Sequence, residues 1–246
     1  MVNFSLTGKN ILIIGSSSGL GETLAKYLYK TNVDIMGISR TKSQNIFKQL
    51  QIDISKKEDL KNFKIYLESN KIKFDGVILN AGISSEPKLK QKDMYKLQST
   101  EEFLKILEVN LIGIYSIMKI IEPFLNNGSS IVGISSIGSE LGFPNNPSYQ
   151  ASKAGLNAMI RSLAVDLSPK KIRANHLNLG YFKAPMTKLS YKDEDLRLQR
   201  AQRTILGRWG ELEEFLGPVI FLLSDASSYI TGSGINVDGG WSIKGL

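Results

Sequence analysis

The sequence predicts one α/β domain in which helices cover a parallel sheet. Two observations lead to this fold class. Short apolar runs alternate with longer amphipathic stretches along the whole chain, and a glycine-rich turn separates the first apolar run from the first amphipathic stretch. With 246 residues, of which 42% are hydrophobic, the chain can bury one large core, and no Pro/Gly/Ser-rich linker divides it. We therefore expect a single domain over residues 1–246.

The expected elements follow one another in strand and helix order. Apolar runs predict seven strands, at Asn10–Ile14, Val33–Ile38, Lys48–Ile52, Gly76–Leu79, Ser130–Ile134, Arg173–Asn178 and Gly234–Val237. Amphipathic stretches predict helices at Gly19–Lys30, Lys56–Ser69, Glu101–Leu125, Tyr149–Leu167 and Glu211–Ser224.

Residues Phe182–Arg208 interrupt this alternation, because they are charged and helix-prone yet follow directly after a strand. Ligands bind beyond the carboxyl ends of parallel strands, and long insertions are often functional. We expect residues 182–208 to form a lid over a substrate; a peripheral helical hairpin is the alternative.

Composition narrows the function classes. The formal charge is +8, but the basic residues are scattered, and the local excess at Lys88, Lys90 and Lys92 is not interleaved with aromatic residues, so we do not expect nucleic-acid binding. The chain has no cysteine, and acidic residues cluster only at 193–195, which argues against a metal site. The start lacks the features of a signal peptide and no apolar run is long enough to span a membrane, so we expect a cytoplasmic protein.

Gly15, Gly19 and Gly21 stand between the first strand and the first helix. A turn of this kind lets the backbone approach a pyrophosphate at the amino terminus of the helix, which predicts a dinucleotide site that includes Ser17, Ser18 and Leu20. A simple glycine turn is the alternative.

The second strand indicates which nucleotide is bound. An acidic residue at its end would bind the ribose hydroxyls of NAD, but the strand ends in Ile38-Ser39-Arg40. A guanidinium suits the 2′-phosphate of NADP, so we favour NADP(H) over NAD(H), with Ser17 as a further donor; Arg40 as a solvated surface residue is the alternative. Asp53 follows the third strand, where it would meet the adenine end or cap the next helix.

Tyr149 and Lys153 stand four residues apart, and Ser136 lies thirteen residues upstream at the end of an apolar strand. Residues i and i+4 share one helix face, so the ammonium would lie beside the phenol and favour its anion. Tyr115 and Lys119 have the same spacing, but no serine-ended strand precedes them, and we expect that pair to be structural.

These residues, together with Asp53-Ile54, Asn80-Ala81-Gly82, Asn110 and the closing Asn-Val-Asp-Gly-Gly-Trp241, occur in an order that resembles the short-chain dehydrogenase/reductase family over nearly the whole chain. The resemblance implies a Rossmann-like, doubly wound, seven-stranded parallel sheet between two helical layers. It also implies a homotetramer, or a homodimer, and a catalytic tetrad of Asn110, Ser136, Tyr149 and Lys153.

Carried over to this chain, the resemblance implies that Ser136 binds the substrate carbonyl and that Tyr149 donates a proton as hydride arrives from the nicotinamide. Lys153 would hold the nicotinamide ribose and lower the pKa of the phenol, and Asn110 would kink its helix. Phe182 would pack on the nicotinamide ring. The threonine expected near the carboxamide is Ala184, for which Thr187 is a possible substitute.

The substrate class stays open between two alternatives. The resemblance includes 3-oxoacyl-[acyl-carrier-protein] reductases, and a basic surface would attract an acidic carrier. The turn Asn126-Asn127-Gly128 lacks the basic residue expected there, which favours a small polar substrate such as a sugar, polyol or sugar phosphate that Lys88, Lys90 and Lys92 would help to recognise. A catalytically silent NADP-sensing protein is a further alternative, although the presence of Tyr149 and Lys153 favours an enzyme.

Overall fold

The computed structural model describes residues 2–42, 47–85 and 97–244. Seven strands form one parallel sheet in the order β3-β2-β1-β4-β5-β6-β7. The strands are β1 Asn10–Ile14, β2 Asp34–Ser39, β3 Lys48–Gln51, β4 Phe74–Leu79, β5 Leu125–Ser136, β6 Arg173–Leu179 and β7 Gly234–Val237. The strand order reverses between β1 and β4, and in such sheets the crevice at that reversal is where ligands bind.

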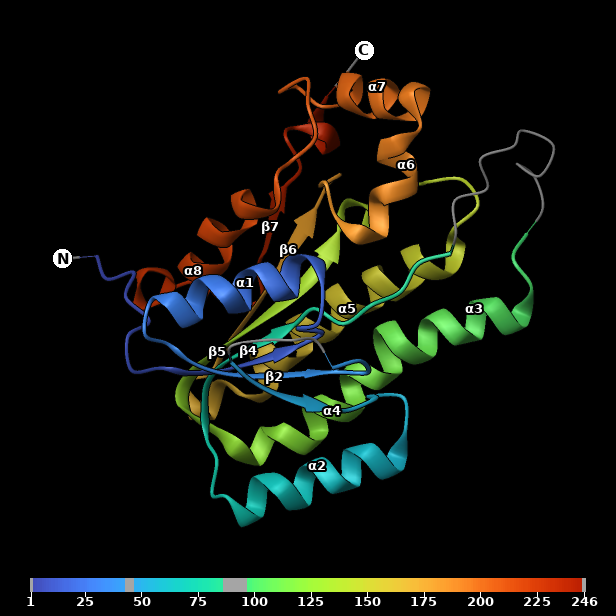
Figure 1. Ribbon diagram of the computed structural model, residues 1–246. Coiled ribbons are helices and arrows are strands. Elements are labelled where there is room, and N and C mark those ends of the chain that lie inside the picture. The colour runs from blue at the N-terminus through green and yellow to red at the C-terminus, as the bar shows by residue number, and fades with distance from the viewer. Residues whose placement is uncertain (1, 43–46, 86–96, 245–246) are drawn as a thin grey trace.

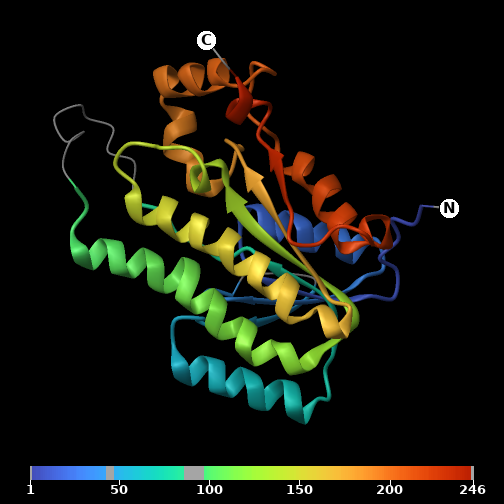
Figure 2. The ribbon, with the colours of Figure 1, turned by 180° about the vertical axis from the view of Figure 1, so that it is seen from behind.

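Helices cover both faces of this sheet (Figure 1), which gives the doubly wound, three-layer arrangement of the prediction. The described helices are α1 Gly19–Lys30, α2 Lys57–Ser69, α3 Thr100–Leu107, α4 Gly113–Ile121, α5 Pro147–Asp166, α6 Lys188–Lys192, α7 Glu194–Arg203 and α8 Leu216–Leu223. One face packs against α1 and α8, and the other packs against α2, α4 and α5, the last of which lies in front in Figure 2.

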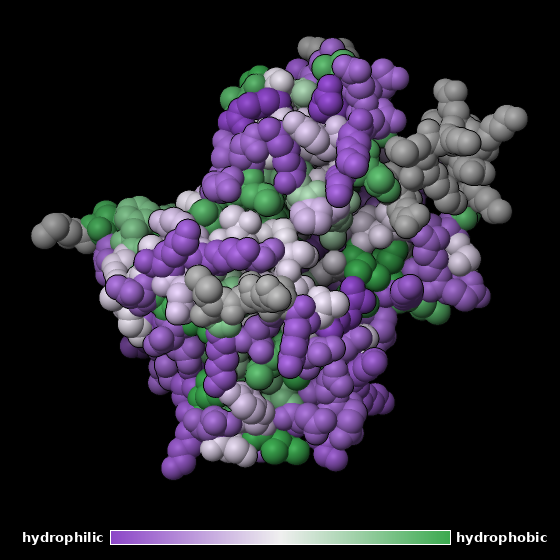
Figure 3. Space-filling view, viewed as in Figure 1, coloured by the Kyte–Doolittle hydropathy of each residue, from purple (hydrophilic) through white to green (hydrophobic). Residues whose placement is uncertain are grey.

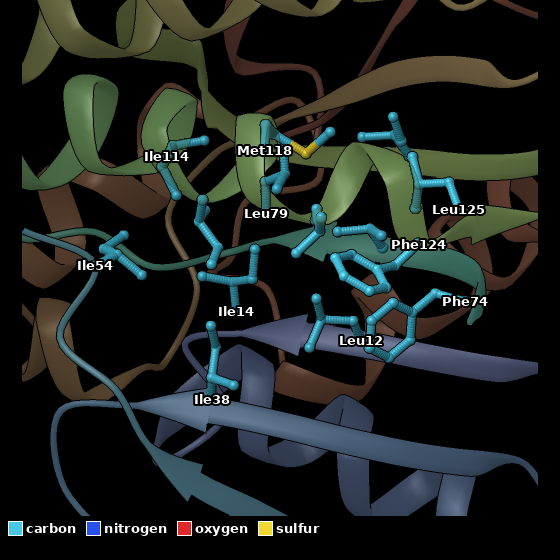
Figure 4. Packing of buried hydrophobic residues seen from close by; sticks show 14 of the residues in the cluster. Leu12, Ile14, Ile38, Ile54, Phe74, Leu79, Ile114, Met118, Phe124 and Leu125 are labelled. Atoms are coloured by element: carbon cyan, nitrogen blue, oxygen red, sulfur yellow. The ribbon is translucent and has the colours of Figure 1, made fainter. Parts of the chain in front are cut away.

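The central strands are apolar on both sides because both of their faces are buried. In β1, Leu12 and Ile14 point into the core beneath α4, where they meet Ile114 and Met118 (Figure 4), and Ile11 and Ile13 point into the core beneath α1 and α8. This rigid centre holds the carboxyl ends of β1, β4 and β5 in fixed positions.

The region predicted as one helix over Glu101–Leu125 is divided in the structure. Between α3 and α4 the backbone makes a π-helical turn at Glu108–Ile112, and a 3₁₀ turn at Glu122–Phe124 follows α4. Pro123 lacks the N–H that an α-helix would need there. Strand β5 starts at Leu125 rather than Ser130, because Leu125 pairs with Phe74 before the register shifts ahead of Gly76.

The segment at 182–208 contains a 3₁₀ turn at Pro185–Thr187 followed by α6 and α7. These two helices lie beyond the carboxyl ends of β5 and β6 (Figure 1). The predicted helix at Glu211–Ser224 begins instead as a 3₁₀ turn at Leu212–Phe215 and continues as α8.

Candidate active site

The glycine turn after β1 is shaped for close backbone approach. Gly15 has φ +89°, and a Cβ there would lie 2.7 Å from the backbone nitrogen of Ala81. A Cβ on Gly21 would lie 2.0 Å from the carbonyl oxygen of Gly15, and Gly19 has φ +55°. Asn80 donates from Nδ2 to the Gly15 oxygen at 2.7 Å and so ties the end of β4 to this turn. Side chains at these positions would fill or distort the turn, which explains the three glycines.

A cavity of about 480 Å³ opens beside this turn, at the carboxyl ends of β1, β2 and β4. The amino terminus of α1 faces it, since Ser18 occupies the N-cap and makes no side-chain capping bond. Eleven of the residues expected to hold the cofactor line it: Gly15, Ser17, Ser18, Gly19, Leu20, Arg40, Asp53, Ile54, Asn80, Ala81 and Gly82. A glycine-lined crevice at a helix amino terminus is suited to a dinucleotide pyrophosphate, so the residues fit the cofactor that the sequence implies.

The end of the cavity beside β2 is polar and basic. Arg40 is exposed there, and Thr41 donates its hydroxyl to Ser17 Oγ at 3.2 Å. Asp53 accepts from the backbone N–H and the hydroxyl of Ser55, at 3.0 and 2.7 Å. Burial raises the pKa of the Asp53 carboxyl, but the Ser55 hydrogen bonds and the charge of Arg40 outweigh burial and leave that pKa below its ordinary value. Asp53 is therefore an anion that interacts electrostatically with Arg40.

Four of the expected cofactor residues, Gly21, Tyr149, Lys153 and Phe182, do not line the cavity. Gly21 is buried beneath Gly15, where its role is close packing of α1 on the strand end. Phe182 is 5% exposed and packs against Gly210 in the core, so its contact with a nicotinamide ring stays a prediction. Ala184 lines the cavity with Pro185 and Met186. The Thr187 hydroxyl donates to the carbonyl oxygen of Phe182 and accepts from the Ala184 N–H, so it caps this turn.

Tyr149 and Lys153 lie on one face of α5, next to the end of β5 that carries Ser136. Lys153 is 4% exposed; its Nζ donates to the carbonyl oxygen of Ile134 at 2.8 Å and lies 5.7 Å from the centroid of the Tyr149 ring. The Ser136 side chain lies close enough to the Tyr149 hydroxyl to lower the pKa of the phenol. Ser136 also accepts from the Gly138 N–H at 3.1 Å, which fixes its rotamer. Two hydroxyl groups thus converge at one point, with an ammonium behind them.

The electrostatics of this cluster differ from the expectation that Lys153 acidifies the phenol. Burial raises the pKa of Tyr149, outweighing the hydrogen bond from Ser136, and Tyr181 raises it further. Burial also lowers the pKa of Lys153 to about 8. Desolvation disfavours the charged form of each group, so in this structure the two pKa values move apart, with that of Tyr149 raised and that of Lys153 lowered. Tyr149 is therefore a neutral phenol that can donate a proton.

Asn110 lies in the π-helical turn and is 1% exposed. Its Oδ1 accepts from the Ile83 N–H and its Nδ2 donates to the Ile83 oxygen, both at 2.8 Å; Nδ2 also donates to Ser152 Oγ at 3.1 Å. The helix is distorted at Asn110, as predicted, and π-helical turns are frequent at functional sites. The amide clamps the loop after β4 to α5, one residue before Lys153.

A cluster of aromatic residues next to Tyr149 was not predicted. Tyr181, two residues after β6, lies 5.0 to 6.3 Å, centroid to centroid, from Trp241, Trp209 and Phe143. The Phe143 backbone is bonded in both directions to the Gln150 side chain. These residues come from loops far apart in the sequence, so no local pattern brings them together; only Trp241 appeared among the residues that carry the family resemblance.

Three further sets of residues lie apart from this cluster or outside the described residues. Tyr115 and Lys119 are exposed on α4, which agrees with a structural pair. His176 is 4% exposed in β6 and is hydrogen-bonded to Asn178 at 3.1 Å. Lys88, Lys90 and Lys92 lie outside the described residues.

Within residues 2–42, 47–85 and 97–244, no three possible metal ligands gather. None of the helices in the described part of the chain is long and apolar enough to cross a membrane.

Comparisons with known proteins agree with this geometry. The sequence model of a family described as Enoyl-(Acyl carrier protein) reductase matches residues 15–242. The chain is 35% identical to the 3-oxoacyl-[acyl-carrier-protein] reductase of Rickettsia conorii, over 96% of this chain and 97% of that protein. The chain belongs to the short-chain dehydrogenase/reductase family.

Relatives with small substrates match over a similar length. The chain is 28% identical to the 5-keto-D-gluconate 5-reductase of Escherichia coli, over 96% of each chain. The structure of a gluconate 5-dehydrogenase from Burkholderia cenocepacia in complex with NADP and tartrate is 25% identical with a TM-score of 0.87, and 99% of each chain is covered. This short-chain dehydrogenase/reductase is therefore an oxidoreductase of a family that interconverts carbonyl and alcohol groups with NAD(P).

Proposed function

We propose that the protein is an NADP(H)-dependent oxidoreductase that interconverts a carbonyl and a secondary alcohol, with Tyr149 as the general acid and base. The observation that carries the proposal is the convergence of the Ser136 and Tyr149 hydroxyls in front of buried Lys153, beside the glycine-lined cavity.

Reduction needs a proton at the carbonyl oxygen and stabilisation of the negative charge that builds there. The bound cofactor supplies the hydride. Ser136 donates a hydrogen bond to the carbonyl oxygen, and Tyr149, a neutral phenol near pH 7, donates its proton to the same atom. Two donors that act on developing charge stabilise the transition state more than the ground state. Lys153 compensates the charge left on the phenolate, and Asn110 holds the loop after β4 against α5.

Preference for NADP(H) is supported by the basic end of the cavity. Arg40, Ser17 and Thr41 present a guanidinium and two hydroxyls there, and no carboxylate follows β2. A 2′-phosphate would bind to such a set through charge-assisted hydrogen bonds. The Burkholderia cenocepacia relative was solved with NADP.

Two substrate classes are supported by different relatives. Similarity to the Rickettsia conorii enzyme supports a carrier-bound 3-oxoacyl substrate. Similarity to the 5-keto-D-gluconate 5-reductase and the tartrate-bound gluconate 5-dehydrogenase supports a hydroxylated acid of low molecular mass. We favour the second class, because α6 and α7 cover the carboxyl ends of β5 and β6, where a lid over a small substrate is expected.

The proposed setting is a cytoplasmic homo-oligomer, a tetramer or a dimer, that binds neither nucleic acid nor membrane and needs no metal. Oligomerisation is supported by exposed apolar side chains on the helices in front in Figure 2, at Leu104, Ile112, Tyr115 and Val165.

The experiment is the substitution Tyr149→Phe, assayed by NADPH oxidation against a panel of ketoses, keto acids and 3-oxoacyl thioesters. Loss of the general acid should reduce kcat/KM by about 10²- to 10⁴-fold, while NADPH binding measured by fluorescence stays near that of the wild type. Tyr115→Phe removes the same hydroxyl from the exposed YxxxK pair and should leave both values unchanged. Equal turnover by the Tyr149 and Tyr115 variants would end the proposal.

A further inference from the structure

Arg200 of α7 stacks on the aromatic cluster beside Tyr149. Its guanidinium carbon lies 4.6 Å from the centroid of the Tyr181 ring and 6.0 Å from that of Trp209. Both distances fall within the range of cation–π contacts. A guanidinium has five N–H donors that remain available for hydrogen bonds beside such a contact.

One nitrogen of the Arg200 guanidinium is buried without a hydrogen-bond partner among the described residues. The Nη1 atom of Arg200 is inaccessible to solvent and makes no hydrogen bond within the described residues. A buried donor without an acceptor costs about 1–3 kcal/mol, and more when it is charged. A buried donor without an acceptor in a native structure needs an explanation, and one explanation is that the donor binds an anionic ligand.

Three neighbouring cations of the same segment have carboxylate partners. Lys183 pairs with Glu211, Arg208 pairs with Glu214 at 2.7 Å, and Arg197 pairs with Glu194 at 3.4 Å. No carboxylate within 4.0 Å of Arg200 is found in the part of the chain that the structure describes. Arg200 therefore differs from its neighbours in being both inward-facing and uncompensated.

Three observations connect Tyr181, the ring in contact with this guanidinium, to Ser136 and Tyr149. Tyr181, on which it stacks, follows β6 two residues after Leu179, and Leu179 is paired in register with Ser136. Tyr181 is close enough to Tyr149 to raise the pKa of its phenol. Phe143, which packs on Tyr181, is bonded to Gln150, the residue after Tyr149.

We infer that Arg200 determines substrate specificity by binding a carboxylate on the substrate, so that the enzyme acts on a hydroxylated keto acid and on the hydroxy acid formed from it. The planar fork of arginine matches a carboxylate in a two-pronged hydrogen bond. The aromatic cluster excludes water around the pair, which strengthens it. The inference rests on the proposed function, because the carboxylate is located relative to the carbonyl that Tyr149 protonates.

The test compares substrates that differ only in the anion. D-gluconate and D-glucitol have the same carbon chain, with a carboxylate in one where the other has CH₂OH. Oxidation of both with NADP and reduction of 5-keto-D-gluconate with NADPH would be measured for the wild type, Arg200→Gln and Arg200→Lys. The wild type should favour gluconate over glucitol by at least tenfold in kcat/KM, and Arg200→Gln should abolish that preference, mainly through KM. Arg200→Lys should restore part of the preference, since it keeps the charge but not the fork.

The matched control is Arg203→Gln, which removes an exposed guanidinium from the end of the same helix and should leave the preference unchanged. Thermal unfolding and NADPH fluorescence identify a variant that has lost the fold or the cofactor site. An equal fall for gluconate and glucitol in Arg200→Gln would mean that Arg200 only packs, and would overturn the inference.

Failure of the inference is distinguishable from failure of the proposed function. A wild type that reduces neutral ketoses or 3-oxoacyl thioesters, but turns over neither acid, would refute the role of Arg200 and leave Tyr149 chemistry standing. A wild type that oxidises NADPH with no carbonyl of the panel would refute both.

Discussion

Lys153 is a cation in a place where charge is unfavourable, and its burial has a consequence for stability. Its pKa falls from an ordinary value of 10.5 to about 8, so between these two pH values the folded protein has released a proton that the unfolded chain still holds. Stability rises with pH wherever the unfolded state binds more protons. The contribution of Lys153 to stability should therefore increase from pH 8 toward pH 10.5.

The direction of this pH dependence can be tested with Lys153→Met, which keeps the apolar part of the side chain and removes the amine. Urea unfolding of the wild type and of the variant would be compared at pH 7 and pH 9.5. The free energy of unfolding of the wild type, relative to the variant, should increase by about 2 kcal/mol at the higher pH. Lys119→Met, at an exposed lysine of α4, is the matched control. A difference for Lys153 that stays constant would mean that its amine is solvated.

Arg40 gives a second prediction at the scale of single residues. Arg40→Gln should weaken NADPH binding by about 10- to 100-fold, because a charge-assisted hydrogen bond to phosphate contributes about 1.5–3 kcal/mol. NADH binding should hardly change, since NADH lacks the 2′-phosphate. Lys42→Gln is the control, because Lys42 is exposed nearby but does not line the cavity. Equal losses for NADPH and NADH in the Arg40 variant would contradict the assignment, and isothermal titration of each nucleotide separates these outcomes.

The residues that line the cavity could be predicted from the sequence because they form short contiguous motifs at strand ends. Gly15 and Asn80 each follow an apolar run, and parallel strands bring their carboxyl ends to one edge of the sheet. The aromatic cluster could not be predicted from the sequence, since Phe143, Tyr181 and Trp209 come from separate loops and no periodicity relates them. The pKa of Tyr149 was predicted in the wrong direction because spacing shows the neighbour of a group but not the depth of its burial.

At the scale of elements, the π-helical turn at Glu108–Ile112 shows where local pattern fails. The apolar periodicity predicted one continuous helix, but the hydrogen bonds of Asn110 to the backbone of Ile83 hold an extra residue in the turn. Those bonds join positions 27 residues apart in the sequence. A tertiary contact therefore sets the geometry of the helix, and no local propensity encodes it.

Asn110→Ala should accordingly destabilise the protein by about 2 kcal/mol, because the backbone N–H and carbonyl of Ile83 would lose their partner. Activity should fall further than stability, since the loop after β4 and α5 would no longer be held together. The control is Asn70→Ala at the exposed end of α2, which removes one solvent-exposed hydrogen bond to the Tyr66 oxygen and should cost about 1 kcal/mol or less. Chemical denaturation measures the stability and NADPH oxidation measures the activity. An Asn110 variant as stable as the Asn70 variant would show that the π-helical turn forms without the hydrogen bonds of Asn110 to Ile83.

At the scale of the whole molecule, the surface seen in Figure 3 is mostly hydrophilic, with apolar residues in scattered patches. Helix α5 lies on the opposite side, in front in Figure 2. The exposed face of α5 carries a row of small or apolar residues, Ala151, Ala154, Ala158, Ser162 and Val165. Small side chains let two helices approach closely, so this face is suited to packing against the same face of a second copy.

Val165 is the most exposed apolar residue of this row, with 71% of its surface accessible. If two copies pack α5 against α5, Val165→Arg would bring like charges together across a two-fold axis, and the assembly should dissociate toward a smaller species. Sedimentation velocity on the wild type should give a mass at least twice the 27.3 kDa of the chain. Ile65→Arg introduces the same charge at an exposed apolar position of α2 and should leave the mass unchanged. A wild type that sediments as a monomer would exclude an assembly. A Val165→Arg variant with the mass of the wild type would mean that the assembly forms through a surface other than α5.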